Sequence, residues 1–310
     1  MRIVFMGTPE FAVPSLNMLI EEGYDIAAVV TQPDKPKGRG NKITAPPVAE
    51  IARSKGIMVM QPVKIKTGEF AEDLKKLNAD LFITVAYGRI LPKEVLDIPK
   101  YGCINVHGSL LPKYRGAAPI QRAIINGETV TGITTMYTDV GMDTGDMLLK
   151  EEIEIPEDMT FGELHDKLAI LGASVLKKTL EKLKDGSLTR TPQNHEEATY
   201  APIIEKETGK IDWSQSTRSI NNLIRGTNPW PVAYCFYENK KMKIWKASIA
   251  DECNIIDKPG KILYVGKDGI KVACGKGILD IKEIQFESSR RMTVGEYICG
   301  HKIETGGFFE

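Results

Sequence analysis

Short, continuous apolar runs alternate with stretches of helical apolar periodicity through the first 185 residues. Residues 2–6 (RIVFM) predict a buried strand, and the apolar positions of residues 11–20 predict the helix that follows it. Further strands are expected at 25–32, 57–60, 81–86, 103–107, 131–138 and 147–154, and helices at 45–55, 69–77, 119–126 and 161–185. This alternation is typical of an α/β domain, so we expect a Rossmann-like, doubly wound sheet that is largely parallel.

The pattern changes after residue 205, where short alternating segments replace the strand–helix repeat. Strands are expected at 232–238, 241–248, 260–265, 269–274 and 277–285, with turn pairs such as Asp268-Gly269 between them. Such strands predict a small Greek-key β-barrel, and periodicity alone leaves OB-like and SH3-like barrels open. A short helix, capped by Ser214 or Ser216, is expected to precede the strands and to end at Arg225.

A polar stretch separates the two patterns. Residues 186–205 contain proline and lack periodicity, so they predict a linker, and His195 within it is expected to be solvated. We therefore expect a first domain at 1–189, a linker at 190–205 and a barrel domain at 206–310.

The composition is that of an ordinary globular protein, with 42% hydrophobic residues. No apolar run is long enough to span a membrane, and the chain enters its first strand without a signal-peptide layout. The five cysteines form no C-x-x-C pair, which predicts reduced thiols and no zinc site. Together these features predict a cytoplasmic protein.

Charge is distributed unevenly although acidic and basic residues are equal in number. Residues 206–310 carry 17 Lys/Arg against 13 Asp/Glu, whereas residues 1–205 carry 24 against 28. A modest basic excess in the second part suits contact with a polyanion. Residues 34–42 (DKPKGRGNK) predict a mobile basic loop, which is either a solvated linker or a flap that orders on phosphate.

The turn after the first strand bears on the class of cofactor. A dinucleotide site calls for G-x-G-x-x-G at this point, but the chain reads G-T-P-E-F-A and keeps only the first glycine. This disfavours NAD-dependent chemistry.

Candidate chemistry lies at residues 102–119 (GCINVHGSLLPKYRGAAP) and 139–146 (DVGMDTGD). The period of two along the strand 103–107 places Asn105 and His107 on one face, at the end where open α/β sheets bind ligands. Asp143 lies in a Gly-rich loop that could bring its carboxylate to the imidazole. Spacing alone leaves a purely structural role for His107 open.

The run NVHGSLLPKYRGAAPIQRAI resembles the signature of the enzymes that transfer a formyl group from 10-formyltetrahydrofolate. The segments MRIVFMGTPEFAVPSL, TQPDKPKGRG, GKIDW and NPWP extend the resemblance from residue 1 to about residue 292. They are most similar to the members of that family that formylate methionyl initiator tRNA for translation initiation.

The resemblance implies roles for individual residues. The implied catalytic residues are Asn105, His107 and Asp143. The implied folate-binding residues are Ser109, Leu110, Leu111 and Pro112, with Gly88 and Ile90 as further candidates. The implied tRNA-binding residues are Lys35, Lys37, Arg39 and Lys42. It also implies a formyltransferase domain followed by an OB-like barrel that contacts tRNA, with 10-formyltetrahydrofolate as co-substrate and no metal. We expect the enzyme to be a monomer.

The chemistry implied is attack of the aminoacyl amine on the formyl carbon. The Asn105 amide and a protonated His107 are expected to stabilise the oxyanion, and Asp143 to support the imidazole and relay a proton. Two alternatives stay open. One is formyl transfer to another amine, such as glycinamide ribonucleotide or a nucleotide-linked amino sugar, and the other is a non-catalytic folate- or RNA-binding module.

Overall fold

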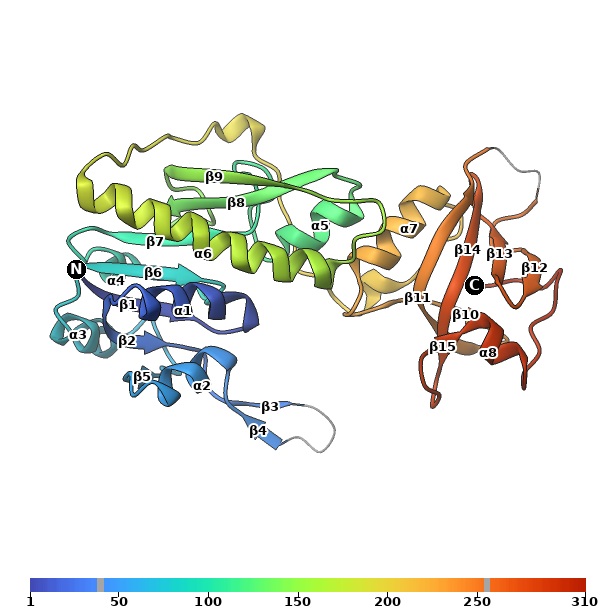
Figure 1. Ribbon diagram of the computed structural model, residues 1–310, viewed down its shortest axis with the longest axis horizontal. Helices are drawn as coiled ribbons and strands as arrows, with labels where there is room; N and C mark the ends of the chain where they lie inside the picture. Colours follow the sequence, from blue (N-terminus) through green and yellow to red (C-terminus); the bar gives the residue numbers. More distant parts are fainter. Residues whose placement is uncertain (38–41, 254–256) are drawn as a thin grey trace. The chain divides into compact units, whose positions relative to one another are not determined.

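The computed structural model describes residues 1–37, 42–253 and 257–310, and the chain divides into two compact units (Figure 1). The first unit comprises Met1–Pro119, Val130–Glu154 and His165–Pro202. The second comprises Ile120–Thr129, Ile155–Leu164 and Ile203–Glu310.

The first unit is built on a seven-stranded sheet with the order β5-β2-β1-β6-β7-β8-β9. Its strands are β1 (Arg2–Gly7), β2 (Asp25–Val30), β5 (Val59–Met60), β6 (Leu81–Val85), β7 (Cys103–His107), β8 (Val130–Tyr137) and β9 (Met147–Glu154). The pairings from β5 to β7 are parallel, and β8 and β9 add to the edge in antiparallel fashion. This confirms the predicted α/β class with a largely parallel sheet.

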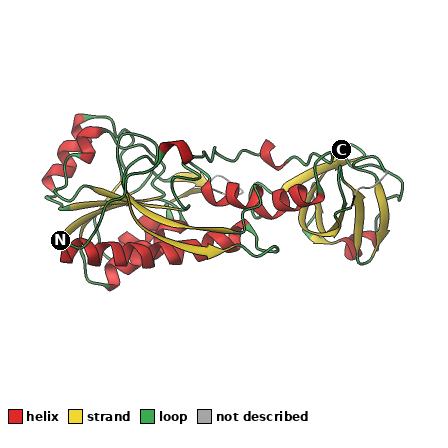
Figure 2. Ribbon diagram, turned by 90° about the horizontal axis from the view of Figure 1, so that it is seen from above, coloured by secondary structure: helices red, strands yellow, loops and turns green. Residues whose placement is uncertain are grey.

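Helices lie on both sides of this sheet (Figure 2). They are α1 (Val13–Glu21), α2 (Pro47–Ser54), α3 (Gly68–Lys76), α4 (Lys93–Leu96) and most of α6 (Phe161–Asp185), with a 3-10 turn η1 (Glu10–Ala12) before α1. The pattern predicted all of these except the one-turn α4 and the turn η1. Four residues of helix are too few to show a period.

The two faces of β7 pack against different elements, which shows on which side of the sheet Asn105 and His107 lie. Gly172 of α6 packs against Val106, so this face of the sheet is covered by α6. Cys103 belongs instead to the apolar cluster that contains Leu74 of α3. Because side chains alternate along a strand, Asn105 shares the face of Cys103, away from α6.

The basic segment differs from the loop that its Pro and Gly content predicts. Residues Lys35–Lys37 form β3 and Lys42–Thr44 form β4, and the two pair as an antiparallel hairpin. Pro36 is accommodated because it lies in a two-stranded ribbon, where one edge of each strand needs no partner. Arg39 lies outside the described residues.

The second unit carries an antiparallel sheet with the order β10-β11-β14-β13-β12, with β15 also paired to β14. Its strands are β10 (Ala233–Tyr237), β11 (Lys240–Asp251), β12 (Ile262–Gly266), β13 (Gly269–Ala273), β14 (Ile278–Phe286) and β15 (Met292–Thr293). The five main strands confirm the predicted small antiparallel β domain.

Helical elements complete the second unit and the segment before it. The unit contains nearly all of α5 (Pro119–Ile125), which the pattern predicted, together with η3 (Glu207–Gly209), α7 (Thr217–Gly226) and α8 (Val294–Ile298). Ser216 is the N-cap of α7, so the second of the two predicted caps is the one used. The short turn η2 (His195–Glu197) lies in the segment that precedes the unit.

The last residues of the chain join the two edges of this sheet. Gly307 accepts a backbone hydrogen bond from Ile262 of β12, and Glu310 exchanges two with Phe236 of β10. Phe309 between them is 3% exposed and belongs to the apolar core of the unit. The tail thus covers strand edges that would otherwise offer unpaired backbone groups.

Candidate active site

His107 ends β7 and is held through one of its two ring nitrogens. The residue is 6% exposed, and its Nε2 lies 3.0 Å from the carbonyl oxygen of Tyr114. A carbonyl oxygen can only accept a hydrogen bond, so Nε2 carries a hydrogen in this arrangement. Nδ1 is therefore the ring nitrogen that is left for a second partner.

Asp143 faces that second nitrogen. Its Oδ2 lies 3.6 Å from His107 Nδ1 and accepts a 2.8 Å hydrogen bond from the backbone N–H of Gly116. The structure thus brings the predicted histidine and aspartate together, although they are 36 residues apart in the sequence. A carboxylate at this place stabilises a positive charge on the imidazole.

The loop that carries Asp143 folds back over the sheet. Because β8 runs antiparallel to β7, its last residue Tyr137 lies opposite Ile104, and the chain must return to reach His107. The return uses tight backbone geometry. Asp143 has a φ of 54°, and a Cβ at Gly145 would lie 1.9 Å from the Tyr137 carbonyl oxygen, so only glycine fits there.

Asn105 presents the nitrogen of its amide. The hydroxyl of Thr84, on the neighbouring strand β6, donates a 2.9 Å hydrogen bond to Asn105 Oδ1. This turns the amide NH₂ away from Thr84, and within the part of the chain that the structure describes no acceptor binds Nδ2. Asn105 therefore has a donor available on the same sheet face as His107.

The turn after His107 is fixed by hydrogen bonds from within the sheet. Ser109 Oγ donates to the Lys113 carbonyl at 2.6 Å, and Thr134 Oγ1 donates to the Ser109 carbonyl at 2.7 Å. Thr134 Oγ1 also accepts from the Leu111 N–H, and Lys150 Nζ donates to the Leu111 carbonyl. The turn is thus a preformed backbone surface.

Burial divides the four residues predicted to contact folate in this turn. The side chains of Ser109 and Leu111 are both 0% exposed, and Leu111 packs in a small apolar cluster. Leu110 and Pro112 are only partly buried. A ligand can therefore reach the side chains of Leu110 and Pro112, whereas Ser109 and Leu111 shape the turn from inside.

A second turn, at Tyr87 and Gly88, follows the end of β6. It lies beside His107 because β6 and β7 are parallel neighbours. Thr8 Oγ1 and Gln32 Nε2 both donate to the Tyr87 carbonyl, each at 3.2 Å. Gly88 follows with a φ of 78°, and a Cβ there would come within 2.6 Å of Gln32 Nε2. The positive φ favours glycine here, and a side chain would also have to displace the Gln32 amide.

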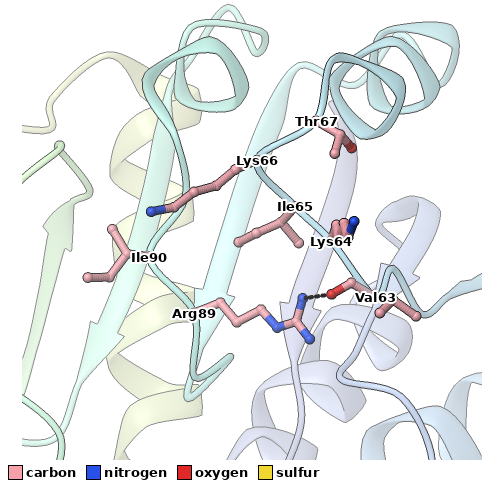
Figure 3. A pocket seen from close by; sticks show the side chains of 7 residues that line it. All are labelled: Val63, Lys64, Ile65, Lys66, Thr67, Arg89 and Ile90. Carbon is pink, nitrogen blue, oxygen red and sulfur yellow. Dashed lines mark hydrogen bonds between the residues drawn. The ribbon is translucent and has the colours of Figure 1, made fainter.

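Ile90 borders a pocket of about 490 Å³ that residue spacing did not reveal (Figure 3). The pocket is lined by Val63, Lys64, Ile65, Lys66, Thr67, Arg89 and Ile90. Arg89 Nη1 donates to the Val63 carbonyl at 2.9 Å and to that of Pro62 at 3.2 Å, which ties the two sides of the pocket together. Three cationic side chains beside apolar ones suit a ligand that is part apolar and part anionic.

Of the predicted tRNA-binding residues, Lys35 is the best defined. Its Nζ donates to Gln32 Oε1 at 3.0 Å, which connects the hairpin with the turn at Tyr87 and Gly88. Lys37 and Lys42 pair with each other through the backbone of β3 and β4.

The predicted linker holds residues that sequence reasoning missed. His195, expected to be solvated, is exposed but has its Nδ1 3.2 Å from both terminal nitrogens of the Arg115 guanidinium. Gln193 is 6% exposed and bonds to both Arg115 and the Asp143 loop. The polar, aperiodic sequence carries no signal for such contacts, because they depend on a tertiary partner far away in the chain.

Neither a metal site nor a membrane span is found in the described ranges. Among residues 1–37, 42–253 and 257–310, no three His, Cys, Asp or Glu side chains are grouped to hold a metal ion. No helix in those ranges is long and apolar enough to cross a membrane.

Comparison with known proteins gives matches along nearly the whole chain. The model of the family "Formyl transferase" matches residues 1–180, and that of "Formyl transferase, C-terminal domain" matches residues 203–302. A methionyl-tRNA formyltransferase of Acetivibrio thermocellus is 67% identical over 306 residues, which is 99% of this chain and 98% of that protein. One of Ruminiclostridium cellulolyticum is 62% identical over 307 residues, with the same coverage.

Solved structures share the fold at lower identity. WlaRD, a sugar 3N-formyl transferase solved with dTDP and 5-N-formyl-THF, has a TM-score of 0.67 at 20% identity and covers 94% of this chain and 99% of its own. HypX from Aquifex aeolicus in complex with tetrahydrofolic acid has a TM-score of 0.64 at 19% identity, covering 97% of this chain and 47% of its own.

Proposed function

The chain belongs to the formyl transferase family, and from this premise we propose that it transfers a formyl group to the α-amino group of methionyl initiator tRNA. The observation that carries this is the 67% identity to a methionyl-tRNA formyltransferase along 99% of the chain. The function is a step of translation initiation, and we therefore propose that the enzyme is cytoplasmic. We also propose that it acts as a monomer.

The donor is a formyl-tetrahydrofolate, as in the rest of the family, and we assign it as the 10-formyl form. Leu110, Pro112, Gly88 and Ile90 are the residues we propose to contact it. The pocket beside Ile90 supports this assignment, since a folate combines an aromatic ring system with the carboxylates of its glutamate. Apolar Ile65 and Ile90 suit the first, and Lys64, Lys66 and Arg89 suit the second.

The reaction passes through a tetrahedral intermediate. The amine nitrogen attacks the formyl carbon, and the carbonyl electron pair moves onto oxygen. The bond from carbon to N10 of the folate then breaks, N10 takes up a proton, and the amine nitrogen loses one. The Asn105 NH₂ is the proposed donor to the oxyanion, supported by the Thr84 contact that leaves it unused in the free enzyme.

His107 and Asp143 are proposed to act as a pair. Nε2 of His107 donates its hydrogen to the Tyr114 carbonyl. The proton that the imidazolium can donate to another group therefore lies on Nδ1, which faces Asp143. Asp143 stabilises the imidazolium and accepts a proton from the attacking amine through water. The 3.6 Å between Nδ1 and Oδ2 is longer than a hydrogen bond, and such contacts often tighten only when substrate is bound.

The tRNA is proposed to be held by the domain at 206–310, which follows the linker at 190–205, and by the basic residues of the segment 34–42, namely Lys35, Lys37, Arg39 and Lys42. On β10, the buried residues Ala233, Cys235 and Tyr237 alternate with the partly exposed Tyr234 and Phe236. Lys241 lies 3.5 Å from the centre of the Tyr234 ring, and Lys210 lies 6.0 Å from that of Phe236. Aromatic rings beside cations are the groups that grip RNA bases and phosphates.

The test is a competition between acceptors. Labelled formyl-folate is offered to the enzyme together with methionyl initiator tRNA, glycinamide ribonucleotide and a nucleotide-linked amino sugar. We expect label on the tRNA alone. Label on a small amine would keep the chemistry but replace the acceptor, and label on none, with folate still bound, would point to a non-catalytic module.

A further inference from the structure

Residues 191–201, which the sequence predicts as part of a linker, pass directly over the catalytic loops, and we call them the strap. We propose that Gln193 of the strap, oriented by Arg115, is a positioning residue that holds Asp143 against His107. This inference rests on the catalytic roles proposed above for His107 and Asp143.

Arg115 is an unusual residue to find inside a protein. It is 2% exposed and is the largest fully buried side chain of the described residues. Its guanidinium is bound by neutral partners: Gln193 Oε1 accepts from Nε at 3.0 Å and from a terminal nitrogen at 2.6 Å, and His195 Nδ1 accepts from both terminal nitrogens. In the described part of the chain no carboxylate pairs with it. A buried cation without a carboxylate costs stability, and the hydrogen bonds from Arg115 to Gln193 and His195 offset part of that cost.

Gln193 uses every hydrogen-bonding position of its side chain. While Oε1 accepts twice from Arg115, Nε2 donates to the backbone carbonyls of Asp143 and Gly145, each at 2.8 Å. The guanidinium decides the direction of the amide, because it can only donate. With Oε1 fixed in this way, the NH₂ must point at the loop that carries Asp143.

Consecutive residues of one segment then converge on the catalytic pair. The Tyr114 carbonyl binds His107 Nε2, the Arg115 side chain orients Gln193 on the Asp143 backbone, and the Gly116 N–H binds the Asp143 carboxylate. Asp143 is therefore held both by its main chain and by its side chain. This arrangement links the segment 114–116 to the loop that carries Asp143. The proposed chemistry needs these two segments at fixed positions relative to each other.

The strap also fixes the backbone of that segment. Thr199 accepts from the Tyr114 N–H through its hydroxyl at 2.8 Å and from the Arg115 N–H through its carbonyl at 2.8 Å. The Ala201 N–H returns a bond to the Arg115 carbonyl at 2.7 Å. At the other end of the strap, Thr191 exchanges two backbone hydrogen bonds with Met147. Gln193 thus lies in a segment that is hydrogen-bonded on both sides of it.

The chemistry of position 193 offers a test that separates positioning from packing. A glutamate there would still accept both bonds from Arg115, and would neutralise it, but it could not donate to the carbonyls of Asp143 and Gly145. If Gln193 served only to satisfy Arg115, then Gln193→Glu would be a full replacement. If it positions Asp143, the same variant fails.

We would measure kcat, both KM values and the melting temperature for Gln193→Glu, with Gln193→Leu beside it. Asn194→Ala is the matched control, because Asn194 is the neighbouring strap residue and, among the residues that the structure describes, its side chain bonds to Glu196 and Glu197 alone. We expect Gln193→Glu to fold normally and to lose about 10²-fold in kcat, the order that a misplacement of about 1 Å costs. Both KM values should stay within about threefold of the wild type, and Asn194→Ala should be as active as the wild type.

The double variant with Asp143→Asn decides how Gln193 acts. If Gln193 works through Asp143, adding Gln193→Glu to Asp143→Asn lowers kcat little further. A Gln193→Glu enzyme with wild-type kcat, or with raised KM values alone, would overturn the inference. An Asp143→Asn enzyme with wild-type kcat would overturn the catalytic assignment itself, so the two failures are distinguishable.

Discussion

The Thr84 hydroxyl donates a 2.9 Å hydrogen bond to Asn105 Oδ1, and this contact leaves the NH₂ of the amide as the end that can donate to a substrate. Thr84 is 7% exposed, so Val can replace it without a change of shape or a new cavity. We expect Thr84→Val to lower kcat about tenfold, because the amide loses the bond that orients it, worth about 1.5 kcal/mol. The KM for folate should not change, and Thr84→Ser should restore kcat. A Thr84→Val enzyme with full kcat would show that Asn105 needs no such orientation.

The lysines of the pocket beside Ile90 predict how tightly the formyl-folate donor binds. Lys64→Gln and Lys66→Gln together should raise the KM for formyl-folate, because two charges that we propose to bind the glutamate carboxylates are removed, while kcat at saturation is kept. The measurement compares folates with one and with several glutamates, and the longer donor should be affected more. Equal KM values for variant and wild type would remove this pocket from the folate site.

The basic residues of the segment 34–42 predict that the KM for tRNA, and not that for folate, depends on salt through them. Replacing Lys35, Lys37 and Arg39 with Ala should raise the KM for tRNA and flatten its dependence on salt, by about one unit of log–log slope for each phosphate that the variant no longer neutralises. The control is Lys75→Ala with Lys76→Ala on α3, since those lysines pair with Glu72 and Asp73 on their own helix. A salt slope equal to that of the wild type would contradict the assignment.

Buried thiols predict how stability depends on alkaline pH. Burial raises the pKa of Cys103 and of Cys274 from the ordinary value of 9.0 to about 11. Between these values the unfolded chain releases protons that the folded chain keeps, so stability falls as pH rises from 9 to about 11. Each thiol contributes on the order of 2–3 kcal/mol to that fall.

The measurement is the free energy of unfolding in urea at about pH 8 and about pH 10.5. Cys274→Ala should lose less stability between the two than the wild type does. Equal losses in both proteins would show that the Cys274 thiol makes no such contribution.

Most of the fold follows from patterns that are local in the sequence. The strand RIVFM and the helix at 161–185 are found where period and composition place them, because each buries one continuous apolar surface. The hairpin of β3 and β4 was missed because its strands are three residues long and one contains Pro36. The closing role of Phe309 could not be seen either, because it depends on strands more than 40 residues away.

The residues of the candidate site likewise include some that the sequence predicts and some that it does not. Asn105 and His107 could be placed on one face from their spacing alone, because strand geometry is fixed. That Asp143 approaches His107 depends on a loop that returns across the sheet. The glycines of that loop allowed the approach, and the resemblance to a family then singled out Asp143. Gln193 and Arg115 gave no signal, since a buried Arg paired with an amide looks like any two polar residues in the sequence.

The most direct measurement is the single-turnover rate of formyl transfer to methionyl initiator tRNA by Asn105→Ala, together with its Kd for folate. If the Asn105 amide binds the developing oxyanion, the rate should fall by about 10²–10³-fold. The folate Kd should stay within about threefold of the wild type, because the amide makes its bond only in the transition state. An unchanged rate, or a Kd that rises as much as the rate falls, would contradict the role of Asn105 in stabilising the oxyanion.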